Sequence, residues 1–169
     1  MRHFIICLPL LFFTLSATAG DFVLGSNSFK DKSALTAVYT CDGLDVSPEL
    51  HWSNIPEKTQ ALALVLSDPD APMGTFYHWL VYNIPPNTSS FAEAVKNMPS
   101  GTLVGKNSWN SAQYKGPCPP KGSAHHYLFT LYALDAKVNV PAEADANTLL
   151  DSFKNHIIKQ IQLSAEYRR

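Results

Sequence analysis

Two short motifs carry most of the side chains that could take part in chemistry. In the first, Asp-Pro-Asp-Ala-Pro (68–72), two carboxylates stand two residues apart, directly after an apolar run. His78 opens the next apolar run. Aspartate and histidine can work together as an acid–base pair, as metal ligands or as hydrogen-bond partners of an ion. Because alternate residues of an extended chain share a side, Asp68 and Asp70 are predicted to face the rim of one cavity.

The second motif is a stiff loop that leads into a histidine-rich segment. Residues 116–122 read Gly-Pro-Cys-Pro-Pro-Lys-Gly, and the prolines fix the shape of such a loop. His125, His126 and Tyr127 follow at the start of an apolar run, so the loop would deliver them at a sheet edge. A further turn-dense loop, residues 40–48, carries Cys41.

Each motif also has a plain structural interpretation. The aspartates could be solvated residues of a proline turn, and His78 could be a packed histidine among aromatic residues. A hydrolase is one alternative, but the sequence has no Gly-x-Ser-x-Gly or other nucleophile context. A zinc site is another, but the His-x-x-x-His and His-Glu-x-x-His spacings are absent. The sequence therefore predicts no catalytic residue, no metal site and no cofactor.

The elements that must position these motifs are mainly short strands. Residues 61–66 form a nearly continuous apolar run, which is typical of a strand buried on both faces. Residues 127–134 form the clearest strand of the chain. Further strands are predicted at 21–29, 50–52, 78–84 and 103–107.

Helix signals are concentrated near the C-terminus. Asp145 is a candidate N-cap, and the apolar residues from Leu149 to Ile161 fall on one stripe with the 3.6-residue period of a helix. We therefore expect one helical segment over this range, packed on a sheet. A helical turn is also expected at 91–95.

Many short strands followed by one helical region predict a mainly β fold. The expected architecture is a two-sheet β-sandwich, or a related Greek-key domain, with peripheral C-terminal helices. The chain has 169 residues and no repeat or linker, so residues 20–169 are predicted to form a single domain. Only 16% of the residues are charged and the formal net charge is −1, which argues against a nucleic-acid partner.

Residues 1–19 have the composition of a signal peptide. An apolar run from Phe4 to Leu15 follows a basic start and leads to an Ala-x-Ala cleavage site at 17–19. An uncleaved membrane anchor is the alternative, but this run spans about 18 Å as a helix, against about 30 Å for a hydrocarbon core. We expect cleavage after Ala19, a periplasmic or secreted protein, and no integral membrane segment after cleavage.

Taken together, the motifs resemble those of the phosphatidylethanolamine-binding protein family, also called Raf kinase inhibitor protein-like. The resemblance is carried by CDGLDVSPELHW (41–52), DPDAP (68–72), HWLVYNIP (78–85) and GPCPPKG…HHYLFTLYALD (116–135). The short connection at 73–77 is similar to that of the bacterial branch. The family implies a two-sheet β fold with a small anion pocket at one edge.

Carried over position by position, the resemblance implies a set of ligand-binding residues. They are Asp68, Asp70, Pro72, His78, Pro120, His125 and Tyr127. In such a site the imidazoles and the tyrosine hydroxyl donate hydrogen bonds to a phosphate or carboxylate group. The aspartates are expected to accept from the other ring nitrogen of the histidines and to raise their pKa, so that anion binding tightens as the pH falls. An aspartate could also take the ammonium of a zwitterionic headgroup. The position after His125 is a histidine where many members have arginine, so the resemblance does not support a cationic lip there.

The implied function is binding without catalysis. The expected ligand is a small anion or a phospholipid headgroup, and a protein partner could be modulated through the pocket. The alternative is an inhibitor of a protease or a kinase pathway that acts through the pocket rim, although an exported copy cannot meet a cytosolic kinase of its own cell. The sequence does not decide between a monomer and a homodimer, and bacterial members of the family often form dimers. Cys41 and Cys118 lie in loops that the resemblance places at the same end of the fold, so a disulfide is expected between them.

Overall fold

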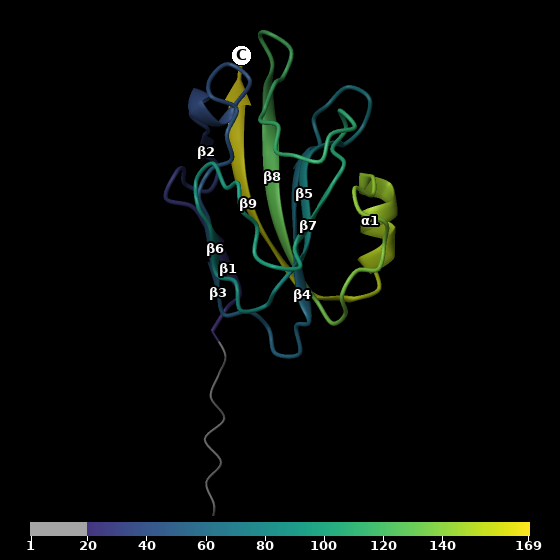
Figure 1. The fold of residues 1–169 in the computed structure, drawn as a ribbon. Helices are drawn as coiled ribbons and strands as arrows, with labels where there is room; N and C mark the ends of the chain where they lie inside the picture. Colours follow the sequence, from purple (N-terminus) through teal and green to yellow (C-terminus); the bar gives the residue numbers. More distant parts are fainter. Residues whose placement is uncertain (1–19) are drawn as a thin grey trace, which may run out of the picture.

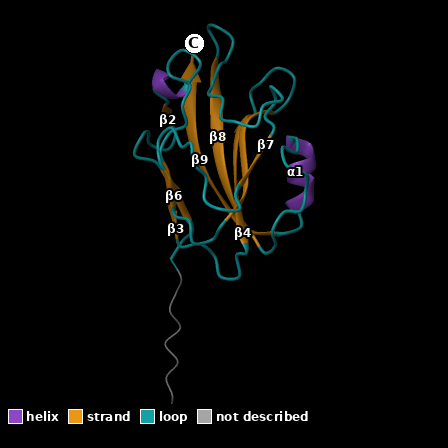
Figure 2. Cartoon of the chain, viewed as in Figure 1, coloured by secondary structure: helices purple, strands orange, loops and turns teal. Residues whose placement is uncertain are grey.

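The chain folds into two β-sheets and one α-helix, as the computed structural model of residues 20–169 shows (Figure 1, Figure 2). The predicted signal peptide, residues 1–19, lies outside the described residues. Within residues 20–169, no helix is both long and apolar enough to cross a membrane.

The larger sheet has six strands in the order β2-β9-β8-β4-β5-β7. They are β2 (Ser33–Ala34), β4 (Ala61–Asp68), β5 (Phe76–Ile84), β7 (Leu103–Gly105), β8 (Ala124–Leu134) and β9 (Ile157–Arg168). Neighbouring strands are antiparallel, except that β2 runs parallel to β9. The strand β4 is therefore central, with β8 on one side and β5 on the other.

The smaller sheet joins β1 (Val23–Gly25), β3 (Leu50–Ser53) and β6 (Ser90–Phe91) in antiparallel order. It lies along one face of the larger sheet, and α1 (Ala146–Phe153) lies along the other face (Figure 1). A short 3-10 helix, η1 (Ala37–Tyr39), is found near the end of the molecule where β9 ends. The predicted mainly β, two-sheet architecture is confirmed.

The central strand β4 is buried on both faces, as its apolar run predicts. Leu62, Leu64 and Leu66 belong to the core that the larger sheet shares with the smaller one. Ala63 belongs to a second core, which Leu149 of α1 helps to close. Burial of side chains on both faces explains why apolar residues follow one another along β4 without alternation.

The prediction of one helix from Asp145 through Ile161 is wrong in its second half. Asp145 does cap α1, because its carboxylate accepts a hydrogen bond from the Thr148 backbone N–H at 2.9 Å. However, α1 ends at Phe153, and the chain continues as β9, which pairs with β8 along almost its whole length. The helical spacing of the apolar residues reflects only their local sequence. Hydrogen bonding of this segment to β8, which is distant in sequence, decides that it forms a strand.

The predicted helical turn at 91–95 is also absent. Phe91 closes β6 and is buried. Ala94 has a φ of 51°, which lies outside the right-handed helical region. Its backbone N–H donates to the Ser47 carbonyl at 2.9 Å, so this segment is held by a neighbouring loop.

Candidate functional site

Three strand ends bring the polar residues together. The strand β4 ends at Asp68, and its two antiparallel neighbours, β5 and β8, begin at this same end of the sheet. His78 lies near the start of β5, and His125 lies near the start of β8. Antiparallel pairing therefore places one carboxylate and two imidazoles side by side, although they are far apart in the sequence.

A pocket of about 260 Å³ opens at this end of the sheet. Its lining residues are Asp68, Ala71, Pro72, Phe76, His78, Trp109, Cys118, Pro119, Pro120 and His125. Five of the residues predicted for the site are in this set, and Asp70 and Tyr127 are not. The two motifs of the sequence thus line one small cavity.

His125 and Asp68 form a buried pair on the pocket floor. Nδ1 of His125 lies 2.8 Å from Oδ2 of Asp68, and both side chains are less than a tenth exposed. The other carboxylate oxygen, Oδ1, accepts the backbone N–H of Asp70 at 2.9 Å. Because Asp68 can only accept from the ring, Nδ1 of His125 carries a proton and Nε2 is left for the pocket.

Asp70 lies away from the pocket. Its Oδ2 accepts hydrogen bonds from Nδ1 and from the backbone N–H of His126, both at 2.8 Å, and both residues are exposed. These contacts with His126 lower the pKa of Asp70. The prediction that Asp68 and Asp70 face the same side is wrong, because β4 ends at Asp68 and a turn follows.

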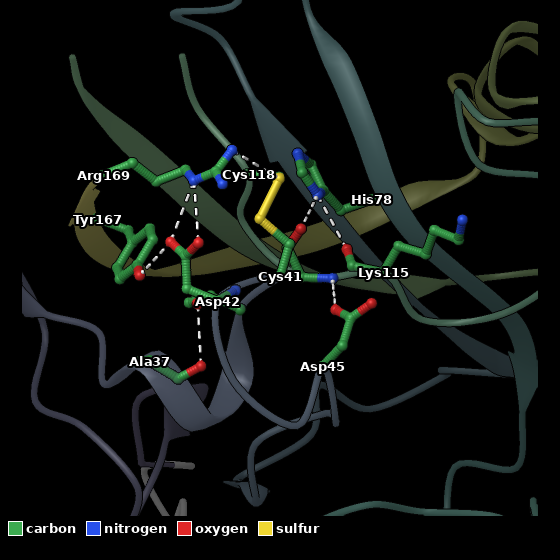
Figure 3. The surroundings of a disulfide bond; sticks show 11 residues. Ala37, Cys41, Asp42, Asp45, His78, Lys115, Cys118, Tyr167 and Arg169 are labelled. Carbon is green, nitrogen blue, oxygen red and sulfur yellow. Dashed lines mark hydrogen bonds and ion pairs between the residues drawn. A yellow bond between two sulfur atoms is a disulfide. The ribbon is translucent and has the colours of Figure 1, made fainter. Parts of the chain in front are cut away.

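His78 is held by backbone carbonyl groups and not by an aspartate. Its Nδ1 lies 2.9 Å from the Lys115 oxygen and 3.1 Å from the Gly116 oxygen (Figure 3). Burial lowers the pKa of His78, although these carbonyls and the Asp68 charge oppose the effect. The prediction that an aspartate orients this histidine is therefore wrong. Asp68 does act to raise the pKa of His78, as predicted, but burial outweighs it and the pKa is lowered.

Tyr127 lies behind the pocket. Its ring contacts that of His78 edge to face, with centroids 5.3 Å apart. Its hydroxyl is buried and has no hydrogen-bond partner among the described residues. Burial and the nearby Asp68 carboxylate raise the pKa of Tyr127, so the hydroxyl keeps its proton.

Aromatic residues form a further wall of the pocket, and Trp109 is the member of it that the sequence did not reveal. Trp109 lies in the loop after β7, and its ring centroid is 4.6 Å from that of Phe76 and 5.1 Å from that of His78. The Lys115 ammonium lies 5.4 Å from the Trp109 ring. No pattern around Trp109 marked it, because only the folded loop brings it against β5.

A disulfide anchors the remaining wall. Cys41 and Cys118 are bonded, with Cα atoms 5.4 Å apart, and Cys118 lines the pocket (Figure 3). The Cys41 backbone N–H also donates to the Pro117 carbonyl at 3.1 Å. The disulfide expected from the family resemblance is present in the structure, and it fixes the proline-rich loop against residues 40–48.

Hydrogen bonds on both sides of the disulfide complete this anchor. The Gly116 backbone N–H donates to Oδ1 of Asp45 at 2.6 Å, and the half-buried Tyr114 hydroxyl donates to the Tyr39 carbonyl at 2.6 Å. Arg169 contacts the same end of the fold, with Nε 3.1 Å from Asp42 (Figure 3). The carbonyls that orient His78 are thus themselves fixed by the loop that carries Cys41.

The pocket has little formal charge. Asp68 is its one carboxylate, and its described lining contains no lysine or arginine. Within residues 20–169, no group of three or more histidine, cysteine, aspartate or glutamate side chains is arranged to hold a metal ion. The histidine side chains leave their Nε2 atoms for a ligand, and the other walls of the cavity are formed by proline, aromatic and disulfide residues.

The fold and the pocket define a class of protein, a small two-sheet β domain with a ligand-sized cavity at the end of its central strands. The sequence model described as phosphatidylethanolamine-binding protein matches residues 25–168. The chain belongs to the phosphatidylethanolamine-binding protein family. Membership in this family indicates a binding protein.

Relatives are found in archaea and bacteria. A UPF0098 protein of Methanothermobacter thermautotrophicus is 37% identical over 149 residues, which cover 86% of this chain and 98% of that protein. The UPF0098 protein YbcL of Escherichia coli is 36% identical and covers 89% of this chain, with 88% of its own length aligned.

Solved structures share the fold over nearly their whole length. The crystal structure of E. coli YbcL, described as a new member of the mammalian PEBP family, has a TM-score of 0.84 at 30% identity and covers 89% of this chain and 99% of that chain. The putative family homologue CT736 of Chlamydia trachomatis has a TM-score of 0.81 at 31% identity and covers 88% of this chain and 97% of its own.

Proposed function

We propose that the pocket binds a small oxyanion, such as phosphate or the phosphoryl part of a headgroup, and does not transform it. The observation that supports this proposal most directly is the buried His125–Asp68 pair in the pocket. When Nε2 of His125 also carries a proton, the imidazolium lies between the Asp68 carboxylate and the bound anion. Such a charge-assisted hydrogen bond is stronger than a neutral one.

The shape of the pocket supports a small ligand. A volume of about 260 Å³ is near the lower end of the range found for small-molecule sites. The prolines and the disulfide keep the walls in place, so the protein loses little conformational freedom when a ligand binds. No described lining residue has the setting of a nucleophile, and Ser67 and Ser123, the serines next to the two motifs, do not line the pocket.

A matched pair of variants tests the proposal. His125→Gln is expected to weaken the binding of inorganic phosphate roughly tenfold or more, because a hydrogen bond to a charged group contributes about 1.5–3 kcal/mol. His126→Gln removes an equally close histidine–aspartate contact, but on the exposed side, and is expected to leave the affinity unchanged. Isothermal titration calorimetry of both variants at one pH and one ionic strength makes the comparison.

The outcome that contradicts the proposal is equally definite. If His125→Gln binds phosphate as tightly as the unsubstituted protein does, the anion does not occupy this pocket. If both variants lose affinity alike, the effect comes from net charge and not from a built site.

A further inference from the structure

His78 presents a hydrogen-bond acceptor to the pocket, and this follows from its backbone contacts. Carbonyl oxygens can only accept, so Nδ1, at 2.9 Å and 3.1 Å from two of them, carries the proton. No described residue pairs with Nε2, which lies on the opposite side of the ring from the carbonyls (Figure 3). In the neutral ring, Nε2 therefore offers a lone pair.

The surroundings of His78 favour this neutral form. The ring is buried among Phe76, Trp109 and Tyr127, which cannot neutralise a positive charge. The carboxylates that act on it are Asp68 of β4 and Asp45 of the opposite loop. These are committed to His125 and to the Gly116 N–H, and burial outweighs them, so the pKa of His78 is lowered.

The charge of the pocket also favours a ligand that carries a hydrogen. Asp68 is a carboxylate at the pocket floor, and the described lining includes no lysine or arginine. A dianion would therefore meet one negative charge and at most one imidazolium at His125. A monoanion that carries a hydrogen fits better, because it meets less repulsion and can donate to His78.

We propose that His78 makes the pocket selective for oxyanions that carry a hydrogen, the monoanions of phosphate and of phosphate monoesters, over sulfate and phosphate diesters. The ligand accepts a hydrogen bond from His125 and donates one to Nε2 of His78. Sulfate and diesters have no hydrogen at neutral pH, so their oxygens would face the lone pair of Nε2. Leaving a buried acceptor unpaired costs about 1–3 kcal/mol. This inference rests on the proposed function and adds the class of ligand to it.

The test compares four probes on the unsubstituted protein at a pH of about 6, near the second ionisation of phosphate monoesters. Calorimetry is carried out with inorganic phosphate, O-phosphorylethanolamine, sulfate and dimethyl phosphate. We expect the first two to bind at least about tenfold more tightly than the last two. Equal affinity for sulfate and phosphate overturns the inference but leaves the proposed function standing. Binding of none of the four removes the proposed function as well.

A variant assigns the selectivity to one residue. In His78→Gln the carboxamide can turn either its oxygen or its NH₂ group to the ligand, so the phosphate-to-sulfate affinity ratio should fall to near one. In His126→Gln, whose histidine lies outside the pocket, the ratio should be kept. A ratio that survives in His78→Gln overturns the assignment.

A spectroscopic measurement does not depend on how well the variant folds. Nitrogen NMR of the unsubstituted protein should show His78 with a protonated Nδ1 and an unprotonated Nε2 at neutral pH. Phosphate should shift the Nε2 signal and sulfate should not. A proton on Nε2 in the free protein contradicts the inference.

The source of the phosphoryl group is distinguished by a vesicle assay. Vesicles of phosphatidylcholine with and without phosphatidate present a phosphate monoester headgroup or only a diester. Retention on phosphatidate vesicles alone indicates a headgroup ligand, and calorimetric binding of phosphate without vesicle retention indicates a free one. Both results support the hydrogen-bearing monoester chemistry, whereas retention on plain phosphatidylcholine contradicts it.

Discussion

His125 and His126 follow each other on β8, and each places its Nδ1 2.8 Å from an aspartate oxygen. Successive residues of a strand point to opposite faces, so one pair is buried in the pocket and the other is exposed to solvent. The same two side-chain types at the same distance therefore have different uses. Screening by water leaves the exposed pair with little energetic effect, whereas the buried pair keeps a fixed hydrogen-bond direction.

His78 should make the stability of the protein depend on pH. Burial lowers its pKa in the folded state from the ordinary value of 6.5. Below about pH 6.5 the unfolded chain therefore binds a proton that the folded protein does not, and the free energy of unfolding falls as the pH falls through this window. One proton contributes a slope of at most about 1.4 kcal/mol per pH unit.

Urea denaturation at several pH values between about 5 and 7.5 measures this slope. His78→Gln should show a smaller loss of stability with acid than the unsubstituted protein, and His126→Gln should match the unsubstituted protein. Equal slopes in all three proteins would show that His78 takes up its proton as easily in the folded state as in the unfolded state.

At the scale of elements, the strands of the site could be predicted from the sequence, whereas β9 could not. The residues of β4 are apolar at nearly every position, a pattern that suits burial on both faces of a central strand. Ile157 and Ile161, in contrast, lie four residues apart and satisfy a helical period. Only the long antiparallel pairing with β8, which is a non-local contact, decides that they belong to a strand.

The loop that carries Gly116 has no room for a side chain. A Cβ atom at this position would collide with the Tyr39 carbonyl oxygen and would lie 2.8 Å from the Thr40 Cα atom. Gly116→Ala should lower the free energy of unfolding by about 1–3 kcal/mol, as overpacking does, and should also weaken phosphate binding. The second effect is expected because the Gly116 carbonyl helps to orient His78.

Gly101→Ala is the matched control for this prediction. Gly101 has a φ of 87° and open space around it, so alanine adds backbone strain without a collision. It should cost some stability and leave phosphate affinity unchanged. Chemical denaturation and calorimetry of the two variants make the comparison, and normal phosphate affinity in Gly116→Ala would contradict the role given to this loop.

At the scale of the whole molecule, the disulfide ties together two loops that are 77 residues apart in sequence. Replacing both Cys41 and Cys118 by serine should lower the free energy of unfolding by about 4 kcal/mol, because the unfolded chain gains the entropy of an open loop. Denaturation with and without reductant measures this. Reduction should destabilise the unsubstituted protein and have no effect on the double variant.

If the unsubstituted protein is equally stable with and without reductant, the disulfide is not formed in solution. Its formation requires an oxidising compartment, which fits the expected export of the chain.

The family resemblance anticipated much of the pocket because its motifs lie at the adjacent ends of strands that pair with one another in the sheet. Asp68, His78 and His125 line the pocket for this reason. The parts that were missed depend on where the chain turns after a strand. Asp70 faces outward once β4 has ended, and Trp109 reaches the pocket only through the packing of its loop on Phe76.

A crystal structure of the protein grown with phosphate tests the central claim most directly. We expect the anion in the pocket between β4, β5 and β8, with oxygen atoms within about 3 Å of Nε2 of both His78 and His125. An empty pocket at a saturating phosphate concentration, or phosphate bound only elsewhere on the surface, would contradict the proposal that this cavity is an oxyanion site.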